Sequence, residues 1–343
     1  MVILGIMSGT SLDGIDYALC EIPSGKESEA HILDAVTLPH HEDMTKALHN
    51  AHNFSQKSLA RIDQEFGFRL AVTVNELIEE RGWKPDLIAS HGHTILHQPD
   101  RGITKQIGSG PELFQETGIP VVCDFRVQDV ELGGQGAPLV PIGDQMLFGQ
   151  YDVCVNLGGF VNLSFEKNNK RVAFDVCPMN IVLNHYAQKL NLPYDDDGQI
   201  ARANAIDQKL LSKLNSLPFY KEVGPKSLGK EWVEKNIFPE LDEVDSALAI
   251  ATLTEHAAEQ LARVIMGRQK VLLTGGGAYN SYFVELLSSK SESQIVIPDR
   301  LTVEFKEALV FALLGYLKWN DQINVLASVT GAKYNHSSGK IYK

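Results

Sequence analysis

Apolar runs separated by short polar turns begin the chain. Val2–Met7 is apolar, Ser8–Gly14 is rich in glycine and hydroxyl groups, and Ile15–Ile22 is apolar again. Apolar runs of this length, bounded by glycine and serine, predict β-strands joined by a turn. The N-terminal segment is therefore predicted to form a β-hairpin.

The same pattern returns in the middle of the chain. Val153–Phe165 contains two apolar runs around Gly158–Gly159, and Arg171–Val176 follows as a third predicted strand. Two segments that each begin with a glycine-tipped hairpin indicate a duplicated fold. The glycine-rich run Leu132–Pro141 is a natural hinge between the two copies.

We therefore expect two α/β domains, each a mixed sheet flanked by helices. The expected bounds are 1–140, with a tail of about 325–343 packing back on this domain, and 141–324. The other apolar patterns predict helices over 41–82, 180–190, 245–267 and 302–316, and strands over 27–38, 86–90, 119–126, 270–274 and 295–297.

The first hairpin tip has the chemistry of a phosphate site. Glycines let backbone N–H groups close on an anion, the hydroxyls of Thr10 and Ser11 can donate to it, and Asp13 offers a hard oxygen ligand for Mg²⁺. No Gly-Lys-Ser/Thr follows, so the segment is not a Walker A loop. The alternative is an ordinary hairpin turn. The second tip, Gly158 and Gly159, favours phosphate binding, since two such tips can grip one polyphosphate.

A third glycine-rich turn follows the predicted strand over 270–274. Gly275, Gly276 and Gly277 would let a flat base or a ribose approach the backbone closely. Asp195–Gly198 could be a calcium loop, but it lacks the later ligands of an EF-hand and is interpreted as a solvated turn.

Polar residues cluster after the predicted strand Asp86–Ser90. A strand that runs into polar residues at its C-terminal end is the usual geometry of a site in an α/β protein. His91, His93 and His97 could chelate zinc, although no carboxylate has suitable spacing. A hydrogen-bonding shelf for a polar ligand, with Thr94 beside it, and an inert turn are the alternatives.

Two further residues are candidates for chemistry. Arg126 follows the predicted strand over 119–126, where its guanidinium could bind a carboxylate or phosphate, or pair with Asp124 or Asp129. Asp175 ends a predicted strand just before a helix, whose N-terminus would favour the ionised carboxylate of a general base. The alternative is that Asp175 only caps that helix.

Composition restricts the possible partners and the compartment. The net charge of -12 argues against nucleic acid and anionic membranes, so a small-molecule substrate is expected. The N-terminus has neither the basic region of a signal peptide nor a membrane-spanning length. Four widely separated cysteines are interpreted as buried free thiols, which indicates a cytoplasmic location: Cys20, Cys123, Cys154 and Cys177.

Several motifs occur in one order along nearly the whole chain. They are Met7–Asp16, Ser90–Thr94, Gly133–Pro141, Asn156–Gly159, Gly275–Ala278 and Ser328–Ala332. Together they resemble the anhydro-N-acetylmuramic acid kinase family, which belongs to the actin-like ATPase superfamily of sugar kinases, chaperones and actin. The resemblance implies a two-domain actin-like (ribonuclease H-like) fold.

The resemblance also implies an activity. The enzyme would use ATP and Mg²⁺ to phosphorylate O6 of 1,6-anhydro-N-acetylmuramic acid while water opens the anhydro bridge, giving N-acetylmuramic acid 6-phosphate in peptidoglycan recycling. Asp175 matches the general base; Arg126 and Thr94 match sugar-binding positions, and His91 and Glu307 are further substrate candidates. A homodimer is implied by the family. The matching ATP-binding segment is Gly9, Thr10, Ser11, Leu12, Asp13, Gly14, Ile15 and Asp16.

The chain departs from the family pattern near the base. Val176–Asn180 stands where Thr-Gly-Pro-Gly-Asn is usual, His93 replaces a common glutamine, and Ser227–Gly229 stands where Ser-Thr-Gly is typical. These departures leave two alternatives open. The chain could be a kinase of a different amino sugar or anhydrosugar, or a regulatory ATPase of the same fold that phosphorylates nothing.

Overall fold

A computed structural model describes residues 1–10, 12–222 and 224–343. The chain divides into two compact units. Unit 1 is Met1–Phe148 with Phe305–Lys343, and unit 2 is Gly149–Glu304. The second crossing lies within helix α12 (Arg300–Trp319), where Phe305 has non-helical dihedral angles (φ -114, ψ 15). The bounds 1–140 and 141–324 stay a prediction for the domains.

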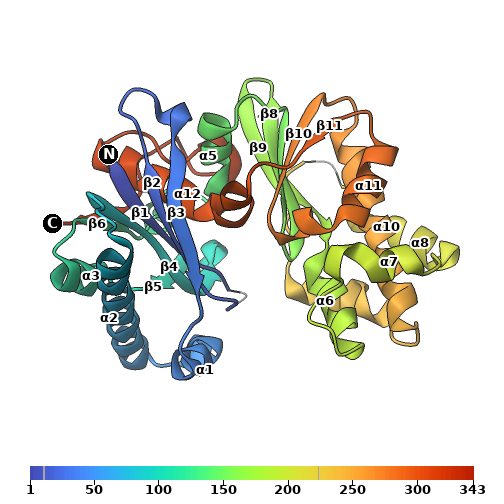
Figure 1. The fold of residues 1–343 in the computed structure, drawn as a ribbon, viewed down its shortest axis with the longest axis horizontal. Helices are drawn as coiled ribbons and strands as arrows, with labels where there is room; N and C mark the ends of the chain where they lie inside the picture. The colour runs from blue at the N-terminus through green and yellow to red at the C-terminus, as the bar shows by residue number, and fades with distance from the viewer. Residues whose placement is uncertain (11, 223) are drawn as a thin grey trace. The chain divides into compact units, whose positions relative to one another are not determined.

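Unit 1 contains one mixed sheet (Figure 1). Its strands are β1 (Val2–Ser8), β2 (Ile15–Glu21), β3 (His31–Leu38), β4 (Leu87–Gln98), β5 (Ile103–Ile107), β6 (Val121–Cys123) and β12 (Lys340–Tyr342). The order is β12-β6-β4-β1-β2-β3, with β5 paired to β4. β1 is antiparallel to β2 and parallel to β4. The predicted N-terminal hairpin is therefore confirmed.

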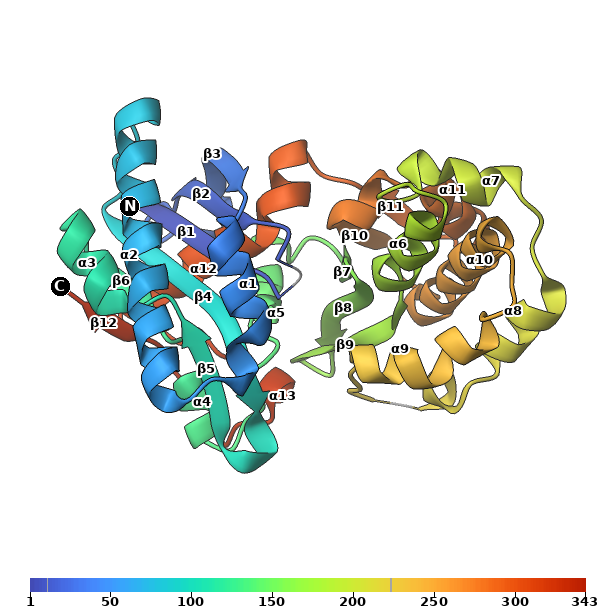
Figure 2. The same ribbon diagram turned by 90° about the horizontal axis from the view of Figure 1, so that it is seen from below.

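Helices cover both faces of this sheet (Figures 1 and 2). Besides α12, unit 1 contains α1 (Glu42–Asn50), α2 (Gln56–Arg81), α3 (Gly110–Thr117), α4 (Val127–Glu131), α5 (Val140–Leu147) and α13 (Ala327–Thr330). Leu4 and Ile6 of β1 pack in one core with Phe66 of α2. Gly5 faces the opposite side, where a Cβ would lie 2.1 Å from the carbonyl oxygen of Ala308. Glycine at this position lets α12 pack directly on the sheet.

One predicted strand end in unit 1 is wrong. The strand predicted over Asp86–Ser90 continues to Gln98, so the histidine segment lies inside β4 and does not form a turn after it. The reason is tertiary: β5 supplies antiparallel partners from His93 to Gln98. Two predicted strands are shorter than expected, since β3 begins at His31 and β6 spans only Val121–Cys123.

The glycine-rich segment after α4 is fastened to unit 1. The Gly136 N–H donates to the Asp129 carboxylate (2.7 Å), and the Gln135 N–H donates to the Thr330 carbonyl (2.8 Å). The Thr330 hydroxyl also donates to Asp129 (2.7 Å). The segment that the sequence marks as a hinge is therefore held in place by α4 and α13.

Unit 2 contains the second sheet, in the order β11-β10-β7-β8-β9. The strands are β7 (Val153–Leu157), β8 (Phe160–Lys167), β9 (Lys170–Pro178), β10 (Lys270–Thr274) and β11 (Gln294–Val296). Its helices are α6 (Asn180–Lys189), α7 (Gln199–Ala203), α8 (Gln208–Asn215), α9 (Lys230–Asn236), α10 (Ser246–Ile265) and α11 (Ser281–Lys290). β7 and β8 are antiparallel around Gly158–Gly159, so the second predicted hairpin is confirmed.

Helix α10 forms much of the core of unit 2. Ala257 and Leu261 are buried in one cluster with Val155 of β7. The Asp245 carboxylate accepts hydrogen bonds from the N–H groups of Ala247 and Leu248, which stabilises the helix start. The predicted helix over 245–267 is thus confirmed.

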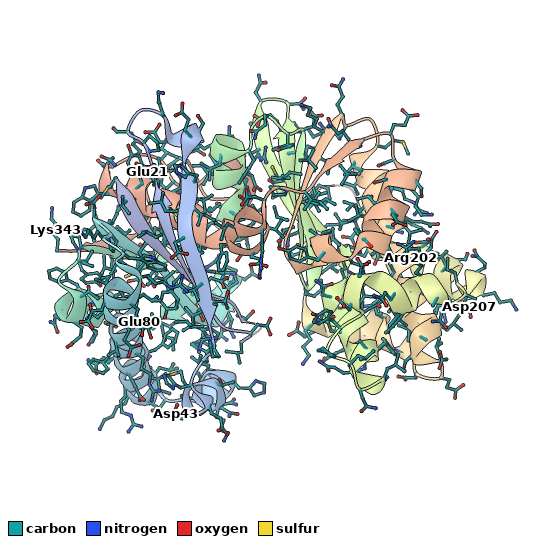
Figure 3. All side chains as sticks on the ribbon, viewed as in Figure 1. Glu21, Asp43, Glu80, Arg202, Asp207 and Lys343 are labelled. Carbon is teal, nitrogen blue, oxygen red and sulfur yellow. The ribbon has the colours of Figure 1, made fainter. Side chains whose placement is uncertain are left out.

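Side chains fill the space between sheet and helices within each unit, and charged groups project outward (Figure 3). Arg202, labelled there, pairs with Glu285 at 2.8 Å on the surface of unit 2. The four cysteines are buried and none of them is in a disulfide, as predicted. Across residues 1–10, 12–222 and 224–343, no helix is both long and apolar enough to cross a bilayer.

Candidate active site

The turn between β1 and β2 presents polar groups to solvent. The Leu12 N–H donates to the Gly9 carbonyl (3.2 Å), and Leu12 adopts a positive φ of 61°. Thr10 and Asp13 are exposed, so their hydroxyl and carboxylate are accessible. Ser11, a predicted phosphate contact, lies outside the described residues. The assignment of this turn to a nucleotide stays a prediction.

The last residues of this segment have partners within unit 1. A Cβ at Gly14 would lie 2.7 Å from Thr37 Cγ2, so β3 by itself requires a glycine here. Ile15 is a buried core residue. The Asp16 carboxylate accepts a hydrogen bond from the Thr37 hydroxyl (2.6 Å). These contacts account for all three residues structurally and do not test whether they also bind a nucleotide.

Arg126 and His91 form a hydrogen-bonded pair in unit 1. Arg126 Nε donates to His91 Nε2 (3.0 Å), and Nη1 donates to the Gly136 carbonyl (2.7 Å). The guanidinium has no acceptor, so His91 Nε2 must be unprotonated. His91 Nδ1 is therefore the protonated nitrogen and donates to the Gly92 carbonyl (2.9 Å). With both ring nitrogens engaged, His91 is not available to a metal.

The charge state of the pair follows from burial. Desolvation, assisted by Arg126, holds the pKa of His91 well below its usual value, so the imidazole is neutral at pH 7. Desolvation also lowers the pKa of Arg126 to about 10, against the opposing effects of Glu307 and Asp129. Among the described residues the guanidinium forms no ion pair with Asp124 or Asp129. The salt-bridge alternative for Arg126 is therefore wrong.

Glu307 lies on α12 near the same guanidinium. Burial raises the pKa of the Glu307 carboxyl, and the charges of Lys306 and Arg126 partly offset this effect. Lys306 pairs with Asp144 at 3.2 Å, with both side chains buried. The structure thus brings two predicted substrate residues, Arg126 and Glu307, within electrostatic reach of each other.

Thr94 has a neighbour that the sequence did not suggest. Gln106 of β5 lies opposite Thr94 in the strand register, and its Nε2 donates to the hydroxyls of Thr94 (3.4 Å) and Thr104 (3.0 Å). Gln106 is buried. Only the pairing of β4 with β5 brings these side chains together, so no local sequence signal could have identified Gln106.

His93 belongs to a different cluster. Its Nδ1 lies 2.9 Å from the Ser8 hydroxyl, and His40 Nε2 lies 3.4 Å from the same oxygen. Burial, with the nearby His40, lowers the pKa of His93 to about 4. Both imidazoles are therefore neutral at pH 7, and their cluster connects the end of β1 to β4.

We expect this cluster to make the protein less stable in acid. Because the pKa of His93 is lower in the folded state than its ordinary 6.5, stability is complete above pH 6.5 and is lost as the pH falls toward 4. The full loss is about 3 kcal/mol. His93→Gln cannot gain a proton, so its melting temperature should fall less than that of the wild type between pH 6.5 and 4.

The control for this measurement is His31→Gln, since His31 is exposed. Melting temperatures of the three proteins, measured from pH 4 to 8, should differ in their pH dependence only for His93→Gln and only below pH 6.5. Parallel curves at every pH would contradict the role given to His93.

In unit 2 the glycine tip is bonded to the start of α6. The N–H groups of Met179 and Asn180 donate to the carbonyls of Gly159 (2.8 Å) and Gly158 (3.2 Å). Asn180 Nδ2 also donates to the Leu157 carbonyl (3.2 Å). The tip is thus fixed by the helix that follows β9.

The triple glycine after β10 packs against the same strand end. Gly275 has φ 81°, and a Cβ there would lie 2.5 Å from Asn156 Oδ1. A Cβ at Gly277 would lie 2.8 Å from Leu157 Cβ, whereas Gly276 faces open space. Two of the glycines therefore permit close packing on β7, and the third leaves room for a ligand.

A cavity of about 420 Å³ opens beside this turn, entirely within unit 2. Its lining includes Gly276 and Gly277, residues of α6, and the loop that the sequence interpreted only as a solvated turn. The lining residues are Asn180, Leu183, Asn184, Tyr194, Asp195, Asp196, Asp197, Gly276, Gly277, Tyr279 and Asn280. The size suits a nucleoside, since small-molecule pockets usually span about 300–1,000 Å³.

Asp175 lies inside β9 and not at a helix start. Helix α6 begins at Asn180 with Met179 as its N-cap, so the capping alternative is wrong, and so is the expected support from the helix N-terminus. The Asp175 carboxylate instead accepts a hydrogen bond from the Leu228 N–H (2.7 Å). Burial raises the pKa of Asp175, and the Leu228 contact opposes this rise. A carboxylate whose pKa is raised in this way is suited to accept a proton.

The unusual residues after Asp175 belong to the core. Val176, Cys177 and Met179 are buried and pack in the hydrophobic cluster of unit 2. These three departures from the family pattern therefore fill the core of unit 2. Lys226 lies beside Asp175, because the Asp175 N–H donates to the Lys226 carbonyl. The Lys226 ammonium donates to the Phe219 carbonyl (2.7 Å).

The described residues outside positions 11 and 223 contain no group of three or more histidine, cysteine, aspartate or glutamate side chains that could hold a metal ion. The zinc alternative for His91, His93 and His97 has no support in this geometry. His97 Nδ1 lies 3.2 Å from the Thr104 hydroxyl.

Two α/β units that each begin with a glycine-tipped hairpin define the actin-like fold. Component A of the (R)-2-hydroxyglutaryl-CoA dehydratase of Acidaminococcus fermentans has a similar fold, with a TM-score of 0.50 over 93% of this chain and 98% of that chain. The two sequences are only 14% identical, so this likeness concerns the fold alone.

The chain belongs to the anhydro-N-acetylmuramic acid kinase family, whose family model matches residues 1–343. The kinase of this name from Shewanella sp. (strain ANA-3) is 34% identical over 353 residues, which cover 96% of this chain and 95% of the relative. That of Bacillus thuringiensis subsp. konkukian (strain 97-27) is 32% identical over 377 residues, 99% of each. The chain is therefore a sugar kinase.

Proposed function

We propose that the chain transfers the γ-phosphoryl group of ATP to O6 of 1,6-anhydro-N-acetylmuramic acid while water opens the anhydro bridge. The product is N-acetylmuramic acid 6-phosphate, an intermediate of peptidoglycan recycling. The observation that carries this proposal is the half-buried Asp175 carboxylate, held by the Leu228 N–H and raised in pKa by burial. A base of this kind is needed to activate water.

The reaction balances with one proton acceptor. Asp175 accepts a proton from the water whose oxygen forms the new bond to C1 of the sugar. As that bond forms, the C1–O6 bond breaks, and O6 keeps the electron pair. O6 forms the bond to the γ-phosphorus as the bond to the β–γ bridging oxygen breaks, so ADP leaves. Aligning these groups and neutralising their charge are the main tasks of the protein.

Unit 1 supplies groups suited to bind the sugar. Arg126 would form a charge-assisted hydrogen bond with the lactyl carboxylate, because Nη2 has no hydrogen-bond acceptor among the described residues. His91, which already accepts from Arg126 Nε, would orient the guanidinium. Thr94 and Glu307 would bind sugar hydroxyl groups.

Nucleotide binding would use the glycine turns. We assign the segment Gly9–Asp16 and the turns at Gly158–Gly159 and Gly275–Gly277 to ATP, supported by the cavity beside the last turn. Glycine-rich turns can present several N–H groups to a phosphate.

Mg²⁺ fits this arrangement. The ion is usually held by one or two carboxylates together with substrate phosphates, and the exposed Asp13 carboxylate supplies one such ligand. Bound Mg²⁺ would neutralise charge on the phosphates during transfer. Asp13 would hold the ion and keep it beside the hairpin tip.

Compartment and assembly are inferred from the family and from composition. The buried free thiols suit a reducing compartment, so we place the enzyme in the cytoplasm. Membership of the family suggests a homodimer. We also propose that 1–140, with the tail from about 325, and 141–324 are the two domains.

The test is to incubate the protein with Mg-ATP and a panel of anhydrosugars in ¹⁸O-labelled water. We expect one phosphorylated product, formed from 1,6-anhydro-N-acetylmuramic acid, with the label at C1 by mass spectrometry. A product from another anhydrosugar alone would redirect the substrate assignment. A phosphorylated product without ¹⁸O at C1 would contradict the attack by water.

A further inference from the structure

We propose that Asp196 binds the ribose hydroxyl groups of the nucleotide and makes the cavity of unit 2 selective for ribonucleotides. This inference rests on the proposed use of ATP and deepens it, because it assigns recognition of the sugar of the nucleotide to one residue. Asp196 lines the cavity beside the glycine turn.

The neighbouring acids are occupied by the protein itself. The two carboxylate oxygens of Asp195 accept hydrogen bonds from the N–H groups of Ile200 (2.8 Å) and Ala201 (3.0 Å). The Asp197 carboxylate accepts from the Ser281 N–H (3.2 Å). These two aspartates are therefore used to build the cavity wall.

Asp196 differs from both neighbours. Its side chain is exposed, and its carboxylate has no hydrogen-bond donor among the described residues. A carboxylate has two oxygens and can accept hydrogen bonds from both hydroxyl groups of a ribose. A 2′-deoxyribose offers one donor fewer, so Asp196 would bind it less tightly.

Aromatic rings at the cavity suit a nucleoside base. Tyr279 and Tyr194 line the cavity and are large side chains left 47% and 53% exposed. The Tyr279 hydroxyl donates to Glu304 (3.1 Å), which holds that ring in place. Every nucleobase can stack on an exposed aromatic ring, because each has a flat π-face. A base against these rings would bring its ribose to the aspartate loop.

Charge fixes the direction of the nucleotide. Asp195, Asp196 and Asp197 would repel phosphate groups, so the phosphates must lie toward the glycine end of the cavity. Gly276 at that end faces open space. The ribose then lies between the base and the phosphates, within reach of the only carboxylate of the loop that the described residues leave without a donor.

The experiment compares ATP with 2′-deoxy-ATP for the wild type, Asp196→Asn and Asp196→Ala. We expect the wild type to favour ATP about tenfold in kcat/KM, the worth of one charge-assisted hydrogen bond at an exposed site. Both variants should lose the preference and act chiefly on the KM for ATP, which Asp196→Ala should raise about a hundredfold because it loses both hydroxyl contacts. The matched control is Asp242→Asn, an exposed aspartate of unit 2 outside the cavity lining.

Calorimetric titration with ADP and 2′-deoxy-ADP, without sugar, measures the affinity of the cavity for each nucleotide independently of turnover. If both variants lose the preference for ADP over 2′-deoxy-ADP in binding, the role of Asp196 is supported even when no sugar is phosphorylated. In that case only the proposed function fails. Equal use of the two nucleotides by the wild type, or an unchanged preference in both variants, would overturn the inference and leave the kinase activity intact.

Discussion

Asp175→Asn is expected to lower kcat about a thousandfold, while ADP still binds with nearly the affinity of the wild type. General-base catalysis contributes about 10²–10⁴ to a rate, and an amide cannot accept the proton of the attacking water. The substitution keeps the size of the side chain and an oxygen that can accept from the Leu228 N–H. Its effect on turnover should therefore be chemical.

The stability of Asp175→Asn distinguishes a catalytic role of Asp175 from a structural one. Burial raises the pKa of Asp175 in the folded state, so the ionised carboxylate costs stability at any pH above that raised value. Asp175→Asn removes this cost, and its melting temperature at pH 7 should equal or exceed that of the wild type. An inactive variant that also melts at lower temperature and loses ADP binding would mean that Asp175 is mainly structural.

The same raised pKa predicts the pH profile of the wild type. The base must be ionised, so kcat/KM should rise with pH through the pKa of Asp175, and this acidic limb should lie above the ordinary range of aspartate. Steady-state rates from pH 3 to 8 test this. A limb at the ordinary value of 3.8 would contradict the desolvated environment.

Arg126→Lys is expected to lower kcat/KM for the sugar about a hundredfold, chiefly by raising KM. Lysine keeps the charge but loses the fork that now bonds His91 and Gly136, so its ammonium cannot hold the lactyl carboxylate in the same geometry. A charge-assisted hydrogen bond is worth about 1.5–3 kcal/mol, which agrees with this loss.

A double-mutant cycle isolates the contact. 1,6-Anhydro-N-acetylglucosamine lacks the lactyl carboxylate. The kcat/KM of the wild type should therefore be lower on this substrate by the same factor as the kcat/KM of Arg126→Lys is lower on 1,6-anhydro-N-acetylmuramic acid. The two losses should not add when variant and truncated substrate are combined. Fully additive losses would show that Arg126 acts elsewhere. The KM for ATP serves as control and should stay unchanged.

The local elements could be predicted from the sequence because their signals are local. The turn segment Ser8–Gly14 and the tip Gly158–Gly159 identify both hairpins, and Gly82 ends α2 in the left-handed conformation (φ 68°) that glycine favours. The predicted helix over 245–267 begins at its aspartate cap. The periodicity of apolar residues was enough to predict a strand or helix wherever neighbouring elements did not change where it begins or ends.

Long-range pairing accounts for the errors. β4 continues past Ser90 because β5 gives its polar residues backbone partners, and this pairing also places Gln106 beside Thr94. The polar residues after Ser90 give no local signal that another strand will pair with them. The predicted turn of histidines therefore became part of a sheet.

The sequence by itself determined the duplicated hairpins, the glycine turns, the family and the candidates Asp175 and Arg126, because residue types and short spacings carry these features. Only the tertiary structure decided the state of each candidate. Burial and the distant Leu228 N–H set the pKa of Asp175, and His91, far along the chain, fixes Arg126. Desolvation and hydrogen bonding depend on neighbours in space, which the order of residues does not reveal.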